Sequence, residues 1–196
     1  MNLKITKQIL LNQLYTPYRN CMQCPLGAQG RKQVVFGAGN PDADLFFIGE
    51  APGATEDTYG LPFIGKSGQL LNKVLQLADI KREDVFISSI IKCRPPGNRK
   101  PFPNEIATCK NLLLDHQIKI VNPKVICTLG STAIEGILEK SVKISQLRGQ
   151  RIIHNNIILI PTFHPAYILR NPQPLQLFIK DISLAAHLTK TDTYMQ

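Results

Sequence analysis

The sequence contains no tryptophan, few aromatic residues and comparatively few acidic residues, and it has no long apolar run. Nowhere does an apolar stretch approach the roughly 18 residues that a membrane-spanning helix needs. Residues 1–14 mix lysines with apolar residues, so they lack the uninterrupted apolar core of a signal peptide and instead predict a short amphipathic helix. These absences exclude an integral membrane protein and predict a cytoplasmic one.

Internal repeats, low-complexity tracts and linkers are also missing. A chain of 196 residues is long enough for one domain with a sizeable core and short for two. The hydrophobic fraction of 43% and the charged fraction of 19% are those of an ordinary globular protein. We therefore expect residues 1–196 to form a single domain.

The shortage of acidic residues leaves a strongly basic chain. Lys and Arg number 23 against 14 Asp and Glu, which gives a formal net charge of +9. Such an excess favours a polyanionic partner such as DNA or RNA, because each neutralised phosphate releases a condensed counterion. A basic protein without a nucleic-acid role is the alternative that charge alone leaves open.

Short apolar runs alternate along the chain with segments of helical period. Buried strands are predicted at residues 45–48, 85–91, 125–129 and 157–160. Helices are predicted around residues 70–78, after residue 103 and over residues 175–188. This alternation predicts an α/β fold of three layers, α/β/α, with a central and mainly parallel four-stranded sheet. In such sheets ligands bind at the carboxyl ends of the strands, where the unusual loops of this sequence lie.

Local signals refine these elements. Asn104, after Pro103, is expected to cap one helix, and Ser131 is expected to cap the helix after Gly130. The pair Asn155–Asn156 between two apolar runs predicts a hairpin that leads into the fourth core strand.

The loop after the first predicted strand concentrates chemistry-bearing residues. Glu50, Glu56 and Asp57 bring three carboxylates within eight positions, and the aromatic Phe63 follows. Glycines in this loop allow backbone N–H groups to approach a ligand, and Phe63 offers a face for a planar base. The loop does not match a phosphate-binding P-loop, because the required glycine spacing before Lys66 is missing. The alternative is a Gly/Pro-rich turn whose acidic side chains are solvated and have no functional role.

Cysteines form a second group of candidates. Reduced thiols in the cytoplasm favour metal ligands or core residues over disulfides. Cys21 and Cys24 have the spacing that lets two sulfurs reach one metal centre, Cys93 follows a strand and Cys109 lies on the next helix. The spacing does not choose between an iron–sulfur cluster and a zinc site, and unrelated free thiols are the alternative. Cys127, inside an apolar run, is expected in the core.

Three segments together resemble one known family. They are GEAPGATEDTYGLPFIGKSGQLL from Gly49, KCRPPGNRKPFPNE from Lys92 and PTFHPAYILRNP from Pro161. In this order, and with the N-terminal cysteine pair and Arg148–Gly149, they resemble the family 4 (thermophile-type) uracil-DNA glycosylases over nearly the whole chain. The resemblance implies an enzyme of base excision repair that removes uracil from DNA. It also implies a [4Fe-4S] cluster bound by Cys21, Cys24, Cys93 and Cys109.

The same resemblance suggests roles in the site. Phe63 is expected to stack on a flipped-out uracil, and backbone amides around Glu50–Ala51 to read the edge of the base. His164, which opens the His-Pro segment, is the expected donor to the uracil anion, whereas the other histidines are expected to be structural. Glu50 and Glu56 are the acids available to orient the attacking water, and the sequence does not show which of the two does so. Ala51 occupies the position where family 1 enzymes have an aspartate.

One position departs from the family pattern. Ser89 stands where family 4 members usually carry an asparagine that contacts uracil. A hydroxyl cannot present a donor and an acceptor together as an amide does, so we expect weaker discrimination between uracil and cytosine.

Further residues are candidates for contacts with DNA. The cationic side chains expected to meet phosphates are those of Arg94, Arg99, Lys100, Arg148 and Arg170. Ile168 and Leu169 are expected either to form an apolar wedge that fills the gap left by the flipped base or simply to pack in a helix.

Two rival functions remain at this point. Ser89 favours a non-catalytic or weakly active DNA-binding relative on the same fold. A metal-bearing nucleic-acid module without catalysis would leave Glu50, Phe63 and His164 without a role. Covalent capture of uracil through a histidine in the loop after the central strand is excluded, since residues 94–102 contain none. We expect a monomer.

Overall fold

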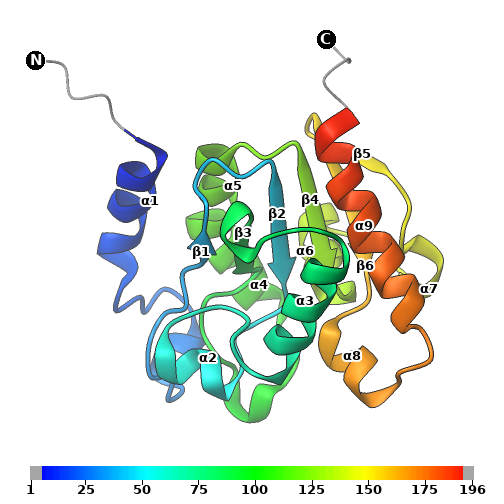
Figure 1. Ribbon diagram of the computed structural model, residues 1–196. Helices are drawn as coiled ribbons and strands as arrows, with labels where there is room; N and C mark the ends of the chain where they lie inside the picture. Colours follow the sequence, from blue (N-terminus) through cyan, green and yellow to red (C-terminus); the bar gives the residue numbers. More distant parts are fainter. Residues whose placement is uncertain (1–5, 192–196) are drawn as a thin grey trace, which may run out of the picture.

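The computed structural model describes residues 6–191 and is built on a central six-stranded sheet (Figure 1). The strand order is β1-β3-β2-β4-β6-β5. The inner strands run parallel, while β1 and β5 at the two edges run antiparallel to their neighbours. The strands are β1 (Ala38–Gly39), β2 (Leu45–Gly49), β3 (Phe86–Ser89), β4 (Val125–Leu129), β5 (Ile152–His154) and β6 (Ile157–Thr162). The predicted four-stranded, mainly parallel sheet is confirmed as the inner part of the sheet, and the edge strands β1 and β5 bring the number of strands to six.

Helices lie before, between and after the strands. They are α1 (Lys7–Tyr15), α2 (Ala54–Tyr59), α3 (Lys66–Leu77), α4 (Pro103–Cys109), α5 (Asp115–Val121), α6 (Ser131–Leu138), α7 (Ile144–Leu147), α8 (Pro165–Arg170) and α9 (Leu175–Thr191). A π-helical turn at Lys110–Leu114 joins α4 to α5 directly after Cys109. Such turns are rare in proteins, and those that occur are often found at functional sites. The first residues of the predicted N-terminal helix, 1–5, lie outside the described residues.

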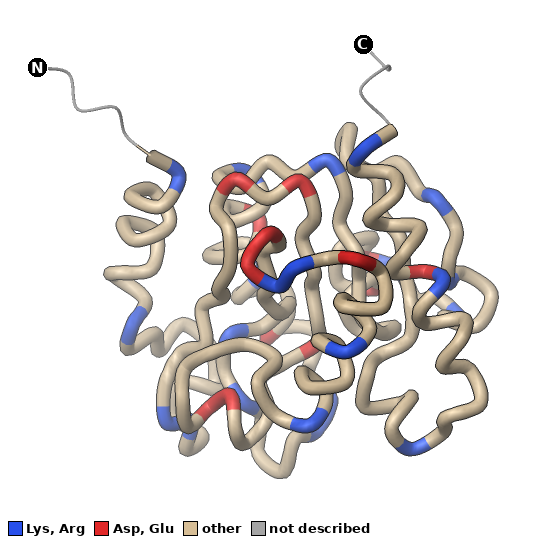
Figure 2. The backbone as a smooth tube through the Cα atoms, viewed as in Figure 1, with Lys and Arg blue, Asp and Glu red and all other residues tan. Residues whose placement is uncertain are grey.

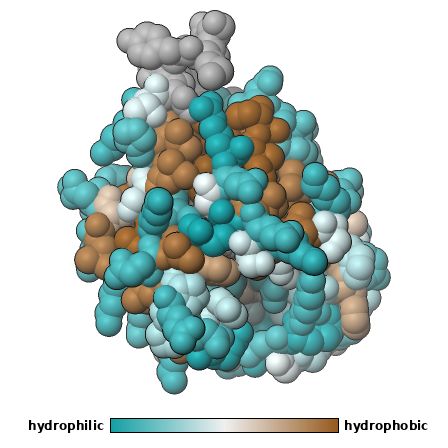
Figure 3. Space-filling view, turned by 90° about the vertical axis from the view of Figure 1, so that its right-hand side faces the viewer, coloured by the Kyte–Doolittle hydropathy of each residue, from teal (hydrophilic) through white to brown (hydrophobic). Residues whose placement is uncertain are grey.

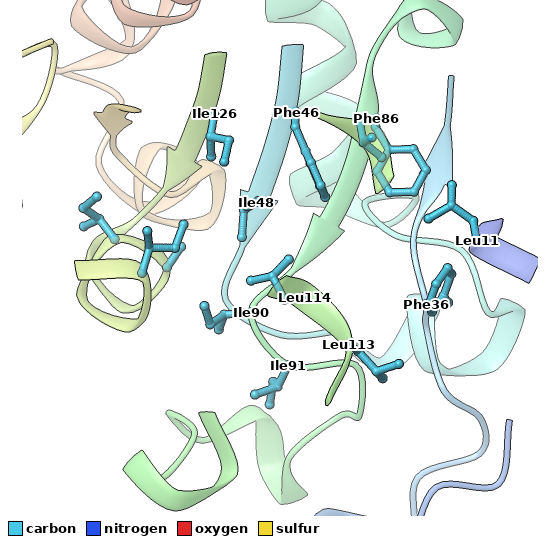
Figure 4. Packing of buried hydrophobic residues seen from close by; sticks show 14 of the residues in the cluster. Leu11, Phe36, Phe46, Ile48, Phe86, Ile90, Ile91, Leu113, Leu114 and Ile126 are labelled. Carbon is cyan, nitrogen blue, oxygen red and sulfur yellow. The ribbon is translucent and has the colours of Figure 1, made fainter. Parts of the chain in front are cut away.

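The inner strands are apolar on both faces because helices cover both. Residues Phe46 and Phe86, in edge-to-face contact at 4.9 Å between ring centroids, face the layer that contains α1, α5 and α6 (Figure 4). Phe47 faces the opposite layer, where α3 and α9 pack. Alternation along a strand sends neighbouring side chains to opposite faces, so a fully buried strand is a continuous apolar run. The three-layer α/β/α prediction is confirmed.

The hairpin between β5 and β6 has the predicted turn. Asn155 and Asn156 take φ values of +48° and +63°. Both lie in the left-handed region that a two-residue hairpin turn requires and that asparagine tolerates.

Both predicted helix caps are displaced. Asn104 lies inside α4, and the cap position is Phe102, whose N–H donates to the Glu105 carboxylate at 2.7 Å. Ser131 is the first residue of α6, and the cap is Gly130 with a φ of +93°. At Phe102 the capping hydrogen bond comes from the carboxylate of Glu105, three residues later, and at Gly130 the positive φ favours glycine over Ser or Asn.

The surface of the described chain mixes polar and apolar groups. Figure 3 faces the right-hand side of Figure 1, where α9 and the β5–β6 hairpin lie, and hydrophobic residues there are interspersed with hydrophilic ones. Among residues 6–191, no helix is long and apolar enough to cross a membrane.

Candidate active site

The parallel strands end around one pocket. Glu50 follows β2, Ser89 ends β3, and His164 comes two residues after β6. These residues line a cavity of about 410 Å³, within the range of roughly 300–1,000 Å³ usual for small-molecule sites. The lining also includes Val35, Ala51, Pro52, Gly53, Glu56, Pro62, Phe63, Ser67, Pro95, Asn98, Arg99, Ala166 and Arg170. The pocket therefore brings together every residue that sequence analysis assigned to catalysis or to the base.

The Glu56 carboxylate holds the loop around the pocket together. It accepts hydrogen bonds from the backbone N–H groups of Gly53 (3.2 Å), Ile64 (3.0 Å) and Gly65 (2.7 Å). The side chain is 8% exposed. A carboxylate with three backbone donors is a structural anchor for the loop.

Phe63 forms one wall and is tightly confined. Its backbone has a φ of +51°, and its ring is 6% exposed. A methyl group on Gly49 would come within 2.4 Å of Cζ of this ring, and one on Gly68 within 1.8 Å of its carbonyl oxygen. Only glycine fits at these two positions, so the end of β2 and the start of α3 together fix the ring.

His164 forms the facing wall, with 6.0 Å between its ring centroid and that of Phe63. Its Nδ1 accepts a hydrogen bond from the Ala166 N–H at 3.1 Å. Burial and, to a smaller extent, the Arg170 cation lower the pKa of His164 to about 4, and the Glu56 carboxylate opposes this shift. The ring is therefore neutral at pH 7 and carries its proton on Nε2, which leaves an N–H donor for a ligand.

Gly130 makes room for this histidine. A methyl group on Gly130 would lie 3.0 Å from His164 Cβ. Its φ of +93° is also one that side-chain-bearing residues rarely adopt. Sequence analysis assigned Gly130 only to a helix boundary.

The two candidate acids differ in their surroundings. Glu56 is occupied by the loop amides, as described above. Within residues 6–191, the Glu50 carboxylate has no hydrogen bond or ion pair, and the residue is only partly buried at the pocket wall. The structure thus ranks Glu50 as the acid available to a ligand.

Ser89 lies at the base of the pocket and is 4% exposed. A methyl group on Gly49 would come 3.6 Å from its Oγ, so the hydroxyl lies beside the Phe63 ring. Among the described residues, the hydroxyl has no hydrogen-bond partner and is available to a ligand.

Several basic residues lie at the end of the molecule toward which β2 points (Figures 1 and 2). Arg170 and Arg99 line the pocket. Arg99 also forms a two-point ion pair with the buried Glu105, at 2.7 and 2.8 Å, and holds the pKa of that carboxyl below its usual range. Arg94 donates to Asn98 at 2.8 Å, and Lys100 pairs with a glutamate at 3.0 Å.

Arg148 does not fit the phosphate contact expected from the sequence. Its guanidinium forms a two-point ion pair with the buried Asp181 on α9 and donates to the Leu177 carbonyl at 3.2 Å. Asp181 also accepts from Thr162 at 2.7 Å. Because its donors are used within the protein, Arg148 stabilises the contact between α9 and the end of β6.

Ile168 is likewise not placed to enter DNA. It is 2% exposed and packs in the core cluster beneath α3 and α9. The neighbouring Leu169 is 48% exposed and Tyr167 is 41% exposed. The apolar side chains that α8 offers to a partner are therefore Tyr167 and Leu169.

Cys21, Cys24, Cys93 and Cys109 line one small cavity although they come from distant parts of the chain. Burial raises the pKa of Cys93 to about 12 and that of Cys109 to about 11. Among the described residues, no three Cys, His, Asp or Glu side chains form a group that could hold a metal ion as it stands. Cys127 is fully buried, as predicted.

Two basic residues near the cysteines were missed by sequence analysis. Arg31 donates to the Cys21 and Gly27 carbonyls, but its buried Nε has no partner within the described chain. Lys92 is fully buried and lines the same cavity. Arg31 follows Cys24 by seven residues and Lys92 directly precedes Cys93, and this nearness in the sequence was the available signal.

The geometry agrees with the comparison to known proteins. The sequence profile of the uracil DNA glycosylase superfamily matches residues 36–183, and the chain belongs to this superfamily.

Within it, the chain is similar to type-4 uracil-DNA glycosylases, which confirms the resemblance to family 4. The one from Thermotoga maritima is 41% identical, and the match covers 95% of this chain and 98% of the relative. The one from Sulfurisphaera tokodaii is 38% identical, with 88% and 81% covered, and the one from Pyrobaculum aerophilum is 37% identical, with 89% and 92% covered.

The buried state of His164 generates a pH prediction. Its folded pKa of about 4 lies below the ordinary 6.5, so between these values the unfolded chain binds a proton that the folded chain does not. The stability that His164 contributes is complete above pH 6.5 and is lost as the pH falls toward 4, by roughly 3 kcal/mol for the full shift. Urea unfolding at several pH values should show this loss in the wild type and not in His164→Gln. A ring that titrates near 6.5 by NMR would contradict the assignment.

Proposed function

We propose that this protein is a uracil-DNA glycosylase that hydrolyses the N-glycosidic bond of deoxyuridine in DNA, the first step of base excision repair. The observation that supports it most directly is the pairing of a buried aromatic wall, Phe63, with the neutral N–H donor of His164 across one pocket. The proposal includes a single domain, a monomer, uracil-containing DNA as partner and a cytoplasmic location.

Binding of the base requires that it leave the duplex. A base inside the stack is out of reach, so the nucleotide rotates into the pocket, where the Phe63 ring stacks on the uracil face. The Ser89 hydroxyl and the backbone amides near Glu50 and Ala51 then form hydrogen bonds with the polar edge of the uracil. The confinement of Phe63 by two glycines keeps the stacking face in place before the base arrives.

The chemical step separates charge. As the C1′–N1 bond breaks, its electron pair moves to uracil and the sugar becomes oxocarbenium-like. The Nε2–H of His164 stabilises the negative charge on a uracil oxygen, in the manner of an oxyanion-hole donor. A neutral imidazole serves this role because it donates without being a strong acid.

Water completes the hydrolysis. Glu50 is the carboxylate at the pocket wall without a partner in the described chain, so it is the group that orients the water and receives its proton as the oxygen bonds to C1′. Glu56 supports the loop instead.

DNA would approach the end of the molecule where the parallel strands finish. Arg94, Lys100 and Arg170 are the cations offered to phosphates there, and Arg99 contributes to the pocket rim while it holds Glu105. Leu169, which is exposed, replaces Ile168 as the residue that fills the space of the flipped base.

The cysteine cavity is suited to a [4Fe-4S] cluster held by Cys21, Cys24, Cys93 and Cys109. These four cysteines would hold the cluster through their thiolates. The unpartnered Nε–H of Arg31, whose guanidinium also donates to the Cys21 carbonyl, is the kind of donor that cluster sulfur would satisfy. The cluster would supply a cross-link between distant segments, and glycosidic hydrolysis needs no electron transfer.

A weakly active DNA-binding relative is the second candidate, favoured by Ser89. The Ser89 hydroxyl fills less of the pocket than an amide and offers one rotatable group. Binding would then persist while base release is slow.

Release of free uracil from an oligonucleotide with one U·G pair tests the activity. Wild-type protein should release uracil and leave an abasic site, whereas T- and C-containing controls should stay intact or, for C, react far more slowly. His164→Ala should lower the single-turnover rate roughly 10²–10³-fold because one charge-stabilising donor is lost. DNA affinity should stay unchanged. Binding without any release would establish the second candidate instead.

Matched amide variants separate the two glutamates. Glu50→Gln should lower the single-turnover rate roughly 10²-fold or more with unfolding unchanged, because only the proton acceptor is lost. Glu56→Gln should lower the free energy of unfolding by about 2 kcal/mol or more, because a charged acceptor of backbone donors is removed. Urea unfolding and single-turnover rates of both variants check this, and the reverse pattern would exchange the roles.

Iron and acid-labile sulfide analysis of anaerobically purified protein tests the cluster. We expect about four of each per chain, with visible absorption that disappears in Cys93→Ser. Cys127→Ser is the matched control and should keep the iron, since Cys127 lies elsewhere in the core. Zinc without iron would overturn the cluster assignment.

A further inference from the structure

Lys92 is a fully buried lysine between the base pocket and the cysteine cavity. It is 0% exposed, comes three residues after the end of β3 and directly precedes Cys93. Lysine is almost never fully buried unless it is paired. None of the steps proposed above uses it.

The side-chain nitrogen of Lys92 is hydrogen-bonded to the end of β3, which forms the base of the pocket. Lys92 Nζ donates to the Ser89 carbonyl at 2.6 Å and to Ser88 Oγ at 2.6 Å. The Ser88 hydroxyl in turn donates to the Phe36 carbonyl at 2.8 Å. The Lys92 side chain thus holds the last two residues of β3 from a position three residues further along the chain.

The other side of Lys92 faces the cysteines. Its backbone N–H donates to Cys109 Sγ at 3.3 Å, and the residue lines the cavity that the four cysteines share. Burial lowers the pKa of Lys92 to about 7, and Cys109, Asp115 and Cys93 oppose this shift when they are ionised. Asp115 already pairs with Lys110 at 3.1 Å.

A buried ammonium without an opposing charge is strongly unfavourable. With Asp115 engaged elsewhere, metal-bound thiolates are the anions left to compensate Lys92. Conversely, a thiolate-ligated cluster carries excess negative charge in a buried place and gains from an adjacent cation.

We propose that Lys92 is a positioning residue that couples the cluster to the base pocket: its ammonium compensates the cluster thiolates while its hydrogen bond to the Ser89 carbonyl fixes the pocket base. This inference rests on the proposed function and its cluster. It predicts that one substitution disturbs both sites, although Lys92 touches neither uracil nor iron.

The test uses cluster-replete full-length protein with Lys92→Met, which keeps the length of the side chain and removes its charge and donors. The cluster should become harder to reduce, with a more negative potential by voltammetry, because a cation that favours the reduced form is gone. A chelator should bleach its visible absorption faster. The dissociation constant of free uracil should rise roughly fivefold to tenfold, the effect of losing about one hydrogen bond. Affinity for undamaged DNA should not change.

Two further variants distinguish coupling from simple packing. Ser88→Ala keeps the ammonium and should leave the potential unchanged. Lys190→Met removes an exposed lysine at the end of α9 and should change none of the readouts. If Lys92→Met does not retain its cluster during purification, Lys92→Gln keeps an N–H donor without the charge and should lower the potential while sparing uracil affinity.

The outcomes separate this inference from the function it rests on. A wild type that releases no uracil overturns the proposed function. A wild type that releases uracil, together with a Lys92→Met variant of unchanged potential and uracil affinity, overturns only the coupling through Lys92. A change in uracil affinity with an unchanged potential also overturns it, because Lys92 would then serve the pocket alone.

Discussion

Close packing at the carboxyl end of the sheet is the constraint on which the site depends. Gly49 at the end of β2 and Gly130 after β4 leave no space for a side chain beside Phe63 and His164. Because the interior is packed as densely as a crystal, these two rings are fixed by neighbours that cannot yield. The pocket is therefore shaped by the backbone of the strand ends, and the functional side chains are placed in it before any ligand arrives.

Charges at this end of the molecule serve two different purposes. Glu56, Glu105 and Asp181 are buried and are used to hold loops and helices through backbone amides or arginines. Glu50 has no such partner in the described chain. A buried carboxylate that is fully hydrogen-bonded stabilises the fold and has little capacity left for chemistry, so the division between anchor and reactive group follows from the number of donors around each.

The sequence predicted the layers well because each inner strand is a continuous apolar run, a signal that burial on both faces produces directly. The two-residue strand β1 carries no such signal. The cap at Gly130 was missed because its close contact with His164 is not encoded in residue preferences. The cap at Phe102 carried a local signal, Glu105 three residues later, which outweighs the preference for Asn104 as the cap.

For the site, the motifs and their spacing correctly located Phe63, Ser89 and His164 at the pocket. They did not show which of the adjacent residues in the same segments also face the pocket. The sequence did not reveal that Arg148 pairs with Asp181, which lies 33 residues away. It left wedge and helix packing open for Ile168 because the face of α8 that meets the core depends on α3 and α9. These are tertiary pairings, which a single sequence does not reveal.

The N-terminal segment suggests why a metal cross-link would lie so near the pocket. Before β1, the described chain has α1 at the edge of the molecule (Figure 1) and short 3₁₀ turns, with Leu11, Leu26 and Val34 among its few buried side chains. So small a hydrophobic contribution leaves a segment weakly held.

In the proposed cluster, Cys21 and Cys24 would fasten this segment to Cys93 and Cys109, and Cys93 lies only four residues beyond Ser89. Val35, which follows the same segment, lines the pocket and donates its N–H to the Lys92 carbonyl at 2.8 Å. A cross-link at the cysteines therefore acts on the pocket from two directions, through the end of β3 and through the strand-like segment that carries Val35. A purely structural group placed here would influence base recognition without taking part in the reaction.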